Sequence, residues 1–106
     1  MSEKADKASL LRALGLCAKA GKLIFGTQQI CAALHQGKPV FLVIEANDTS
    51  ASTHKKLTDK CTFYHKGIKQ VQADTITLAA SVGHSGELAA VGITDQNLAR
   101  LVEQTI

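Results

Sequence analysis

Apolar residues recur with helical spacing in several stretches of the chain. In the first stretch, Leu10, Leu14 and Cys17 follow the 3.6-residue period of an α-helix with one buried face. The hydroxyl of Ser9 suits the N-cap of this helix, and Gly21 suits its C-terminal end. The same spacing predicts further helices over 27–36, 52–65 and 74–82, and a last helix after residue 94.

Capping residues and glycines mark the expected ends of the later helices. Thr27 and Thr94 are predicted to cap the second and last helices, because a hydroxyl can accept from the free N–H groups of a first turn. Gly37, Gly67 and Gly83 are predicted to end the second, third and fourth helices. The residues expected to face inward are Ile30, Ala33 and Leu34; Leu57, Cys61 and Tyr64; Ile76, Ala79 and Ala80; and Leu98, Leu101 and Val102.

Short apolar runs between these helices predict strands at 23–25, 40–44, 68–71 and 88–93. The run from Val40 to Ile44 has no polar alternation, which is typical of a central strand covered on both faces. Because helices and strands alternate, we predict an α/β fold, a three-layer α/β/α sandwich with a mixed, mostly four-stranded central sheet. A chain of 106 residues supports a single domain over 9–106, preceded by a flexible N-terminal segment, residues 1–8.

Composition narrows the class of partner only slightly. The net charge of +3 permits an anionic partner without requiring one. There is no Trp and only one Tyr, so a surface that stacks many bases on aromatic rings is disfavoured. No charged-apolar leader and no run of about 20 apolar residues is present, so we expect a cytoplasmic protein that does not contact membranes.

The three cysteines, Cys17, Cys31 and Cys61, form no Cys-x-x-Cys pair, so we expect free thiols in a reducing compartment and no zinc site. No nucleophile elbow, Walker-type loop or paired-carboxylate string occurs. Neighbouring turn residues such as His84 and Ser85 do not make a catalytic triad. We therefore predict no catalytic residues, no metal ligands and no cofactor.

The strongest candidate for chemistry is the string Gly26-Thr27-Gln28-Gln29, between a predicted strand and a predicted helix. Glycine lets another backbone approach closely, and the start of a helix presents free N–H groups to an anion. Glutamine amides donate to and accept from base edges. These properties indicate a reader of phosphate and base, with RNA as the expected ligand.

Other residues extend this candidate site. Lys19, Lys22 and Lys38 lie at predicted turns, and we expect a cationic rim around the start of the second helix. Asn47 and Asp48 follow the predicted central strand, at the end where α/β folds place ligands. A second group of lysines, on the third predicted helix, is interpreted as an ordinary solvated face. That group is Lys55, Lys56 and Lys60.

Several strings in this order are similar to one protein family. They are Leu14-Gly15-Leu16, Ala18-Lys19-Ala20-Gly21-Lys22, Gly26-Thr27-Gln28-Gln29, Gly37-Lys38, Ala46-Asn47-Asp48, Leu57-Thr58-Asp59-Lys60-Cys61 and Val91-Gly92-Ile93-Thr94-Asp95. Over residues 10–102 the chain resembles the kink-turn RNA-binding ribosomal protein family, of L-seven-Ae and L-thirty-e type. Within that family it is most similar to the stand-alone bacterial members of YlxQ type.

The resemblance implies a compact α/β/α domain that grips a sharply bent RNA internal loop. It places Gly26 at the start of the second helix and implies that Gln28 and Gln29 contact sheared G·A pairs. A family lysine one turn further on is replaced by Ala32, which implies weaker binding because a phosphate contact is lost. The family's second contact loop falls on His84, Ser85 and Gly86, and it is polar here where strong binders are apolar.

We therefore predict a non-enzymatic, monomeric RNA-binding protein of ribosomal-protein type, associated with the ribosome or translation, with structured RNA as its partner. One alternative is a protein–protein interaction module on the same fold, which would have a ribosomal or other protein as its partner. A second alternative, a small metabolite-binding or enzymatic domain, is disfavoured by the missing catalytic motifs.

Overall fold

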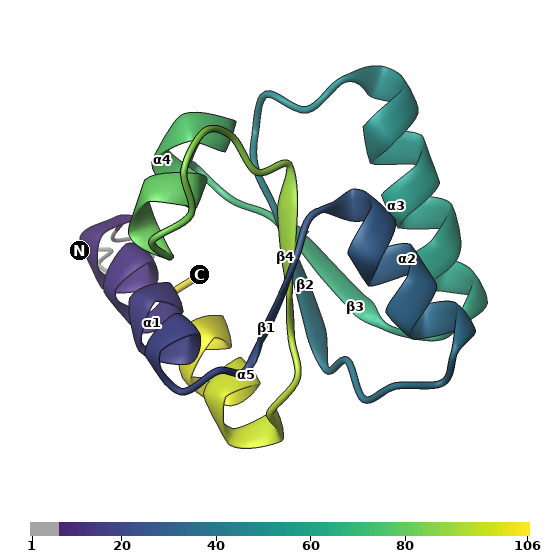
Figure 1. Cartoon of the computed structure of the whole chain (residues 1–106), viewed down its shortest axis with the longest axis horizontal. Helices are drawn as coiled ribbons and strands as arrows, with labels where there is room; N and C mark the ends of the chain where they lie inside the picture. Colours follow the sequence, from purple (N-terminus) through teal and green to yellow (C-terminus); the bar gives the residue numbers. More distant parts are fainter. Residues whose placement is uncertain (1–6) are drawn as a thin grey trace.

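The computed structural model describes residues 7–106 as a four-stranded sheet between two layers of helices (Figure 1). The helices and strands are α1 (Lys7–Lys19), β1 (Leu23–Phe25), α2 (Thr27–His35), β2 (Leu42–Glu45), α3 (Ala51–Phe63), β3 (Gly67–Gln70), α4 (Thr75–Ser81), β4 (Ala90–Ile93) and α5 (Gln96–Glu103). The predicted alternation of helices and strands is confirmed. The predicted flexible segment lies outside the described residues apart from Lys7 and Ala8, which are already helical.

The sheet has the strand order β1-β4-β2-β3. Strand β4 is antiparallel to both β1 and β2, whereas β2 and β3 are parallel. Ile93 is level with Leu23 on one side and with Leu42 on the other. The predicted mixed four-stranded sheet is therefore confirmed, and β1 and β3 form its two edges.

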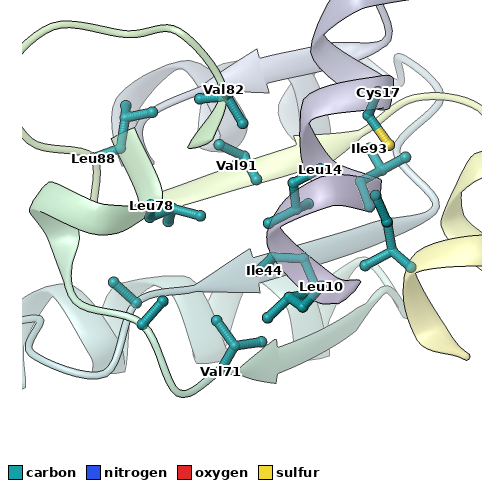
Figure 2. Close-up of a cluster of buried hydrophobic side chains, with 14 of the residues drawn as sticks. Leu10, Leu14, Cys17, Ile44, Val71, Leu78, Val82, Leu88, Val91 and Ile93 are labelled. Atoms are coloured by element: carbon teal, nitrogen blue, oxygen red, sulfur yellow. The ribbon is translucent and has the colours of Figure 1, made fainter. Parts of the chain in front are cut away.

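Helices α1, α4 and α5 cover one face of the sheet, and α2 and α3 cover the other (Figure 1). Alternate residues of the two central strands enter the two apolar cores: Ile44 and Val91 face α1 and α4 (Figure 2), and Val43 and Ala90 face α2 and α3. Every residue of β2 and β4 is buried. The three-layer sandwich predicted from the continuous apolar run is confirmed.

Several predicted helix ends are wrong by one or two residues. Ser9 lies within α1, not at its N-cap. Asp95, not Thr94, caps α5, because its carboxylate accepts from the Leu98 N–H at 2.9 Å. Helix α3 ends without the help of Gly67, since His65 takes the left-handed conformation with a φ of 59°.

The inward face of α4 also differs from the prediction. Leu78 and Ala79 are buried, whereas Ala80 is exposed and Ile76 is 62% exposed. Leu78 and Val82 are one turn apart, and both fit the core, so they set the orientation of this seven-residue helix. In α5, Val102 is buried as predicted, but Leu101 is partly exposed and Ala99 takes its place in the core.

All three cysteines are free, as predicted. Cys17 and Cys61 are buried and Cys31 is partly buried. Burial raises the pKa of the Cys61 thiol to about 11, and it also raises the pKa of Cys17, so both are protonated and unreactive at neutral pH. None of the helices formed by residues 7–106 combines the length and the apolar character needed to span a membrane.

A buried carboxylate was not anticipated from the sequence. Glu45 is the last residue of β2 and is fully buried on the α3 side of the sheet. His54 Nδ1 lies 2.9 Å from both of its carboxylate oxygens, and the Thr49 hydroxyl donates to Oε2 at 2.5 Å. These contacts tie the start of α3 to the end of the central strand. They also stabilise the fold, because a buried carboxylate without hydrogen-bond partners would be costly.

Replacement of His54 by alanine should therefore destabilise the protein. The His54→Ala variant leaves the buried Glu45 carboxylate with one partner fewer, and we expect a loss of about 1–3 kcal/mol in the free energy of unfolding. Urea denaturation followed by circular dichroism measures this loss. Lys56→Ala, which removes an exposed side chain from α3 that forms no ion pair within residues 7–106, is the control. Equal losses in the two variants would contradict the assigned role of His54.

Candidate nucleic-acid interface

Three segments that are distant in sequence meet where β4 begins. The Gly26 N–H donates to the Ala90 carbonyl at 3.0 Å, and the Ala46 N–H donates to the Ala89 carbonyl at 2.8 Å. The turn before α2 and the turn after β2 therefore lie on either side of the chain that enters β4. That chain carries the His84-Ser85-Gly86 loop, so the sheet brings three of the predicted contact segments to one end.

The start of α2 is built around a glycine. Gly26 is the N-cap, with φ 90° and ψ 153°, a conformation open almost only to glycine. Thr27 was predicted as the cap, and that prediction is wrong because Thr27 is already the first helical residue. Its hydroxyl is buried and has no hydrogen-bond partner among residues 7–106.

Consequently, α2 begins with unsatisfied donors. The first helical hydrogen bond runs from the Ile30 N–H to the Gly26 carbonyl, and no side chain among residues 7–106 caps the helix. Within the described part of the chain, the N–H groups of Thr27, Gln28 and Gln29 lack acceptors. Gln28 and Gln29 are exposed, so this turn offers backbone and amide donors together.

The loop before β4 lies beside this turn. The ring of His84 is 5.5 Å, centre to centre, from the ring of Phe25, the residue that precedes Gly26. The His84 N–H donates to the Ala79 carbonyl at 2.9 Å, which fixes the loop to the end of α4. His84, Ser85 and Gly86 are all exposed, and they form a polar rim next to the start of α2.

The Asn47-Asp48 turn completes the arrangement on the other side of β4. The Asp48 carboxylate accepts from the Thr75 N–H at 2.8 Å, so it holds the turn against the start of α4. The Asn47 N–H donates to the Ala73 carbonyl. The Asn47 side chain is exposed and makes no hydrogen bond within residues 7–106, which leaves its amide available to a ligand.

The three lysines of the predicted cationic rim are not gathered at the start of α2. Lys22 lies at the opposite end of β4, where its carbonyl accepts from the Thr94 N–H. Lys38 follows the C-terminal end of α2, and its N–H donates to the Ala33 carbonyl. Lys19 ends α1. The sequence did not indicate this, because a turn's position along the chain does not say at which end of the sheet the turn lies.

Two grooves nevertheless connect lysines to the contact segments. One groove of about 400 Å³ lies between α2 and the edge strand β1, and Gln29, Ala32 and Lys38 are among the residues that line it. A second groove, between α1 and the end of α4, is lined by Lys19 and by Gly83, the neighbour of His84. Ala32, where the resemblance expects a lysine, thus lies between Gln29 and Lys38 in the same groove.

The electrostatics of this end of the sheet are not cationic. The segments 26–29, 46–50 and 84–89 contain no lysine or arginine, and they carry the carboxylates of Asp48 and Glu87. Nearby, the Thr77 N–H donates to Asp74 and lowers the pKa of this carboxyl group, so it stays charged. Among residues 7–106, no three His, Cys, Asp or Glu side chains are grouped to hold a metal ion.

The sequence is similar to that of known proteins. The sequence pattern of the ribosomal protein L7Ae/L30e/S12e/Gadd45 family matches residues 8–103. The chain is 33% identical over 86 residues to the RNA-binding protein YlxQ of Bacillus subtilis (strain 168), which covers 81% of this chain and 83% of that protein.

Solved structures share the fold. A Bacillus halodurans protein, described as having unknown function, superposes with a TM-score of 0.79 and 35% identity, over 92% of this chain and 99% of its own. The Giardia lamblia 15.5kD RNA binding protein superposes with a TM-score of 0.73, over 99% of this chain and 93% of its own. At 16% identity the second similarity concerns the fold alone.

The conformation of Gly26 leads to a direct test of the helix start. A methyl group added at Gly26 meets no atom within 4 Å, so Gly26→Ala should cost only the backbone strain of about 1–3 kcal/mol. Urea denaturation measures the cost. The control is Gly67→Ala in β3, which needs no positive φ and meets only one side-chain atom, at 3.4 Å. A Gly26→Ala protein as stable as the wild type would show that the turn does not require glycine.

Proposed function

Because the chain belongs to the ribosomal protein L7Ae/L30e/S12e/Gadd45 family, we propose that it is a non-enzymatic RNA-binding protein that recognises a kink-turn or a related G·A-containing bent internal loop. The B. subtilis relative is named as an RNA-binding protein, which supports RNA as the ligand. The site for this RNA is the end of the sheet where α2 begins, with the Asn47 turn and the His84 loop on either side of β4.

One observation carries the proposal. Within residues 7–106, the first turn of α2 presents three N–H groups without acceptors and two exposed glutamine amides. The preceding Gly26 has no side chain to block the approach of a ligand. The N–H groups and the positive end of the helix dipole suit a phosphate. Gln28 and Gln29 suit the purine edges that sheared G·A pairs leave without Watson–Crick partners. The proposed selectivity therefore comes from the amides and the affinity from phosphate contacts.

The two grooves extend this mechanism to the lysines. A helical stem that leaves the bent loop along α2 would pass Ala32 and reach Lys38, whose charge can neutralise a phosphate. Lys19 offers a similar contact beside the His84 loop. Such contacts position the RNA without reading its sequence. Lys22 is assigned the same role at the edge of the sheet.

In the cell, the proposed protein is a monomeric, cytoplasmic component of a ribonucleoprotein. It is associated with the ribosome or translation and works without a cofactor. The alternative is a protein–protein interaction module that has lost kink-turn specificity. One observation favours that alternative: the three contact segments contain no lysine or arginine, and Ala32 supplies no charge between them and Lys38.

A titration with two RNAs separates these functions. The first is a kink-turn RNA, and the second is the same RNA with its G·A pairs replaced by Watson–Crick pairs. The proposal expects sub-micromolar binding to the first only, measured by fluorescence anisotropy. Equal weak binding to both RNAs, or no binding, would reject kink-turn recognition and favour the protein-interaction module.

Gln29→Ala should weaken binding to the kink-turn RNA about tenfold, the effect of losing one good amide pair with a base edge. The free energy of unfolding should change by less than about 0.5 kcal/mol, because the side chain is exposed. The control is Gln72→Ala, an exposed glutamine that precedes α4. Unchanged RNA binding together with a clear loss of stability would contradict the assigned role.

Ala32→Lys should strengthen binding to the kink-turn RNA. The exposed position lines the groove between Gln29 and Lys38, so a lysine there adds one phosphate contact and steepens the salt dependence by about 0.7–0.9 in the logarithmic slope. Gln104→Lys adds the same charge beyond α5 and serves as the control. An equal gain from both variants would mean that general charge, not the groove, controls affinity.

A further inference from the structure

The positive charge of the chain is concentrated on α3 and the turn that follows it. Residues 51–66 contain four lysines and one aspartate, a net charge of +3. This equals the net charge of the whole chain, so the remaining residues balance to zero. The excess charge therefore lies away from the start of α2, on a surface to which the proposed function assigns no role.

One hollow on this surface combines cations with aromatic rings. It is lined by Lys56, Asp59, Lys60, Phe63 and Tyr64, and we call it the α3 hollow. The Lys55 ammonium donates to the Asp59 carboxylate at 2.7 Å, which neutralises the one acid in it. Within residues 7–106, Lys56 and Lys60 form no ion pair, so their charges are available to a ligand.

The spacing of these residues places them in one row. Lys60 follows Lys56 by four residues and Phe63 follows Lys60 by three, so all three side chains project from the same side of α3. Leu57 and Cys61 face the core. The two lysines are about 6 Å apart along the helix axis, a separation that suits neighbouring phosphates of an extended strand.

Phe63 is the most exposed large apolar residue in the described chain, with 72% of its surface open to solvent. Its ring packs edge-on against Tyr64, with centres 4.8 Å apart and an angle of 83° between the planes. The Tyr64 hydroxyl lies 3.4 Å from His35 Nδ1 on α2, at hydrogen-bond distance. Tyr64 is thus held by the neighbouring helix, and Phe63 is left with an open face.

We propose that the α3 hollow is a second RNA-binding surface, which takes single-stranded RNA with a base stacked on Phe63 and phosphates on Lys56 and Lys60. An open aromatic face beside unpaired cations is the arrangement that binds single strands without sequence preference. Charge favours RNA over an apolar protein partner, because an apolar partner would leave both lysines without counter-charges. The inference is independent of kink-turn recognition, since the hollow lies on another helix.

Fluorescence anisotropy with a short labelled oligouridylate tests the proposal, because this RNA contains no G·A pairs. Phe63→Leu should weaken its binding about tenfold, whereas Phe63→Tyr should retain it. Lys60→Gln should lower the logarithmic salt slope by about 0.7. The controls are Ile76→Ala, which removes exposed apolar surface from α4, and Arg100→Gln, which removes an exposed cation from α5.

The kink-turn RNA and its Watson–Crick counterpart keep the two proposals apart. Variants of the α3 hollow should leave the ratio of the two affinities unchanged, because both RNAs carry the same phosphates. If the wild type does not discriminate between the two RNAs, only the proposal of kink-turn recognition is rejected, and the proposal for the α3 hollow is unaffected. The proposal for the α3 hollow is rejected if the wild type does not bind oligouridylate, or if Phe63→Leu and Lys60→Gln bind it like the wild type. It is also rejected if the control variants lose as much affinity for oligouridylate as these two variants.

Discussion

Strands β2 and β4 are buried on both faces, and every other element takes its position from them. Their side chains alternate between two apolar cores, so each face must be covered by helices. Because β4 lies between β1 and β2 and is antiparallel to both, the turns that leave β1 and β2 meet beside the chain that enters β4, at one end of the sheet. The buried Glu45 carboxylate, held by His54 and Thr49, fixes where the chain leaves β2 for α3.

Charge and hydrogen-bond donors are separated in this molecule. The end of the sheet at the start of α2 offers N–H groups and amides but no cation in its three contact segments. The outer surface of α3 offers cations and an open aromatic ring. Hydrogen-bond donors held in a fixed geometry favour selectivity among RNAs. Flexible lysines instead contribute RNA affinity that depends on salt concentration. The two properties therefore belong to different helices.

Features that depend on local spacing could be predicted from the sequence, and features that depend on distant pairing could not. The spacing of Ile30, Ala33 and Leu34 located α2, and the apolar run before Glu45 identified a central strand. Thr27 and Thr94 were plausible caps, but their neighbours Gly26 and Asp95 occupy those positions. Single-residue shifts of this kind depend on backbone geometry that no periodicity encodes.

The site was predictable to a similar degree. The Gly26 turn, the Asn47 turn and the His84 loop do meet, because the turns after β1 and β2 both pair with the chain that runs from this loop into β4. Lys22 and Lys38 lie at the other end, which became evident only from the antiparallel register of β1 and β4. Glu45 gave no signal, since an acid that ends an apolar run looks like the first residue of a polar turn.

The position of β4 also sets the order in which the protein can fold during synthesis. Strand β4 is the last in the chain, yet it lies between β1 and β2, so residues 23–25 have no strand partner until residues 90–93 have been made. Pairing over such a separation is slow, because the loop must close before the contact is gained. Until then the nascent chain exposes the unpaired edges of β1 and β2, which are sites for aggregation or for protection by a chaperone.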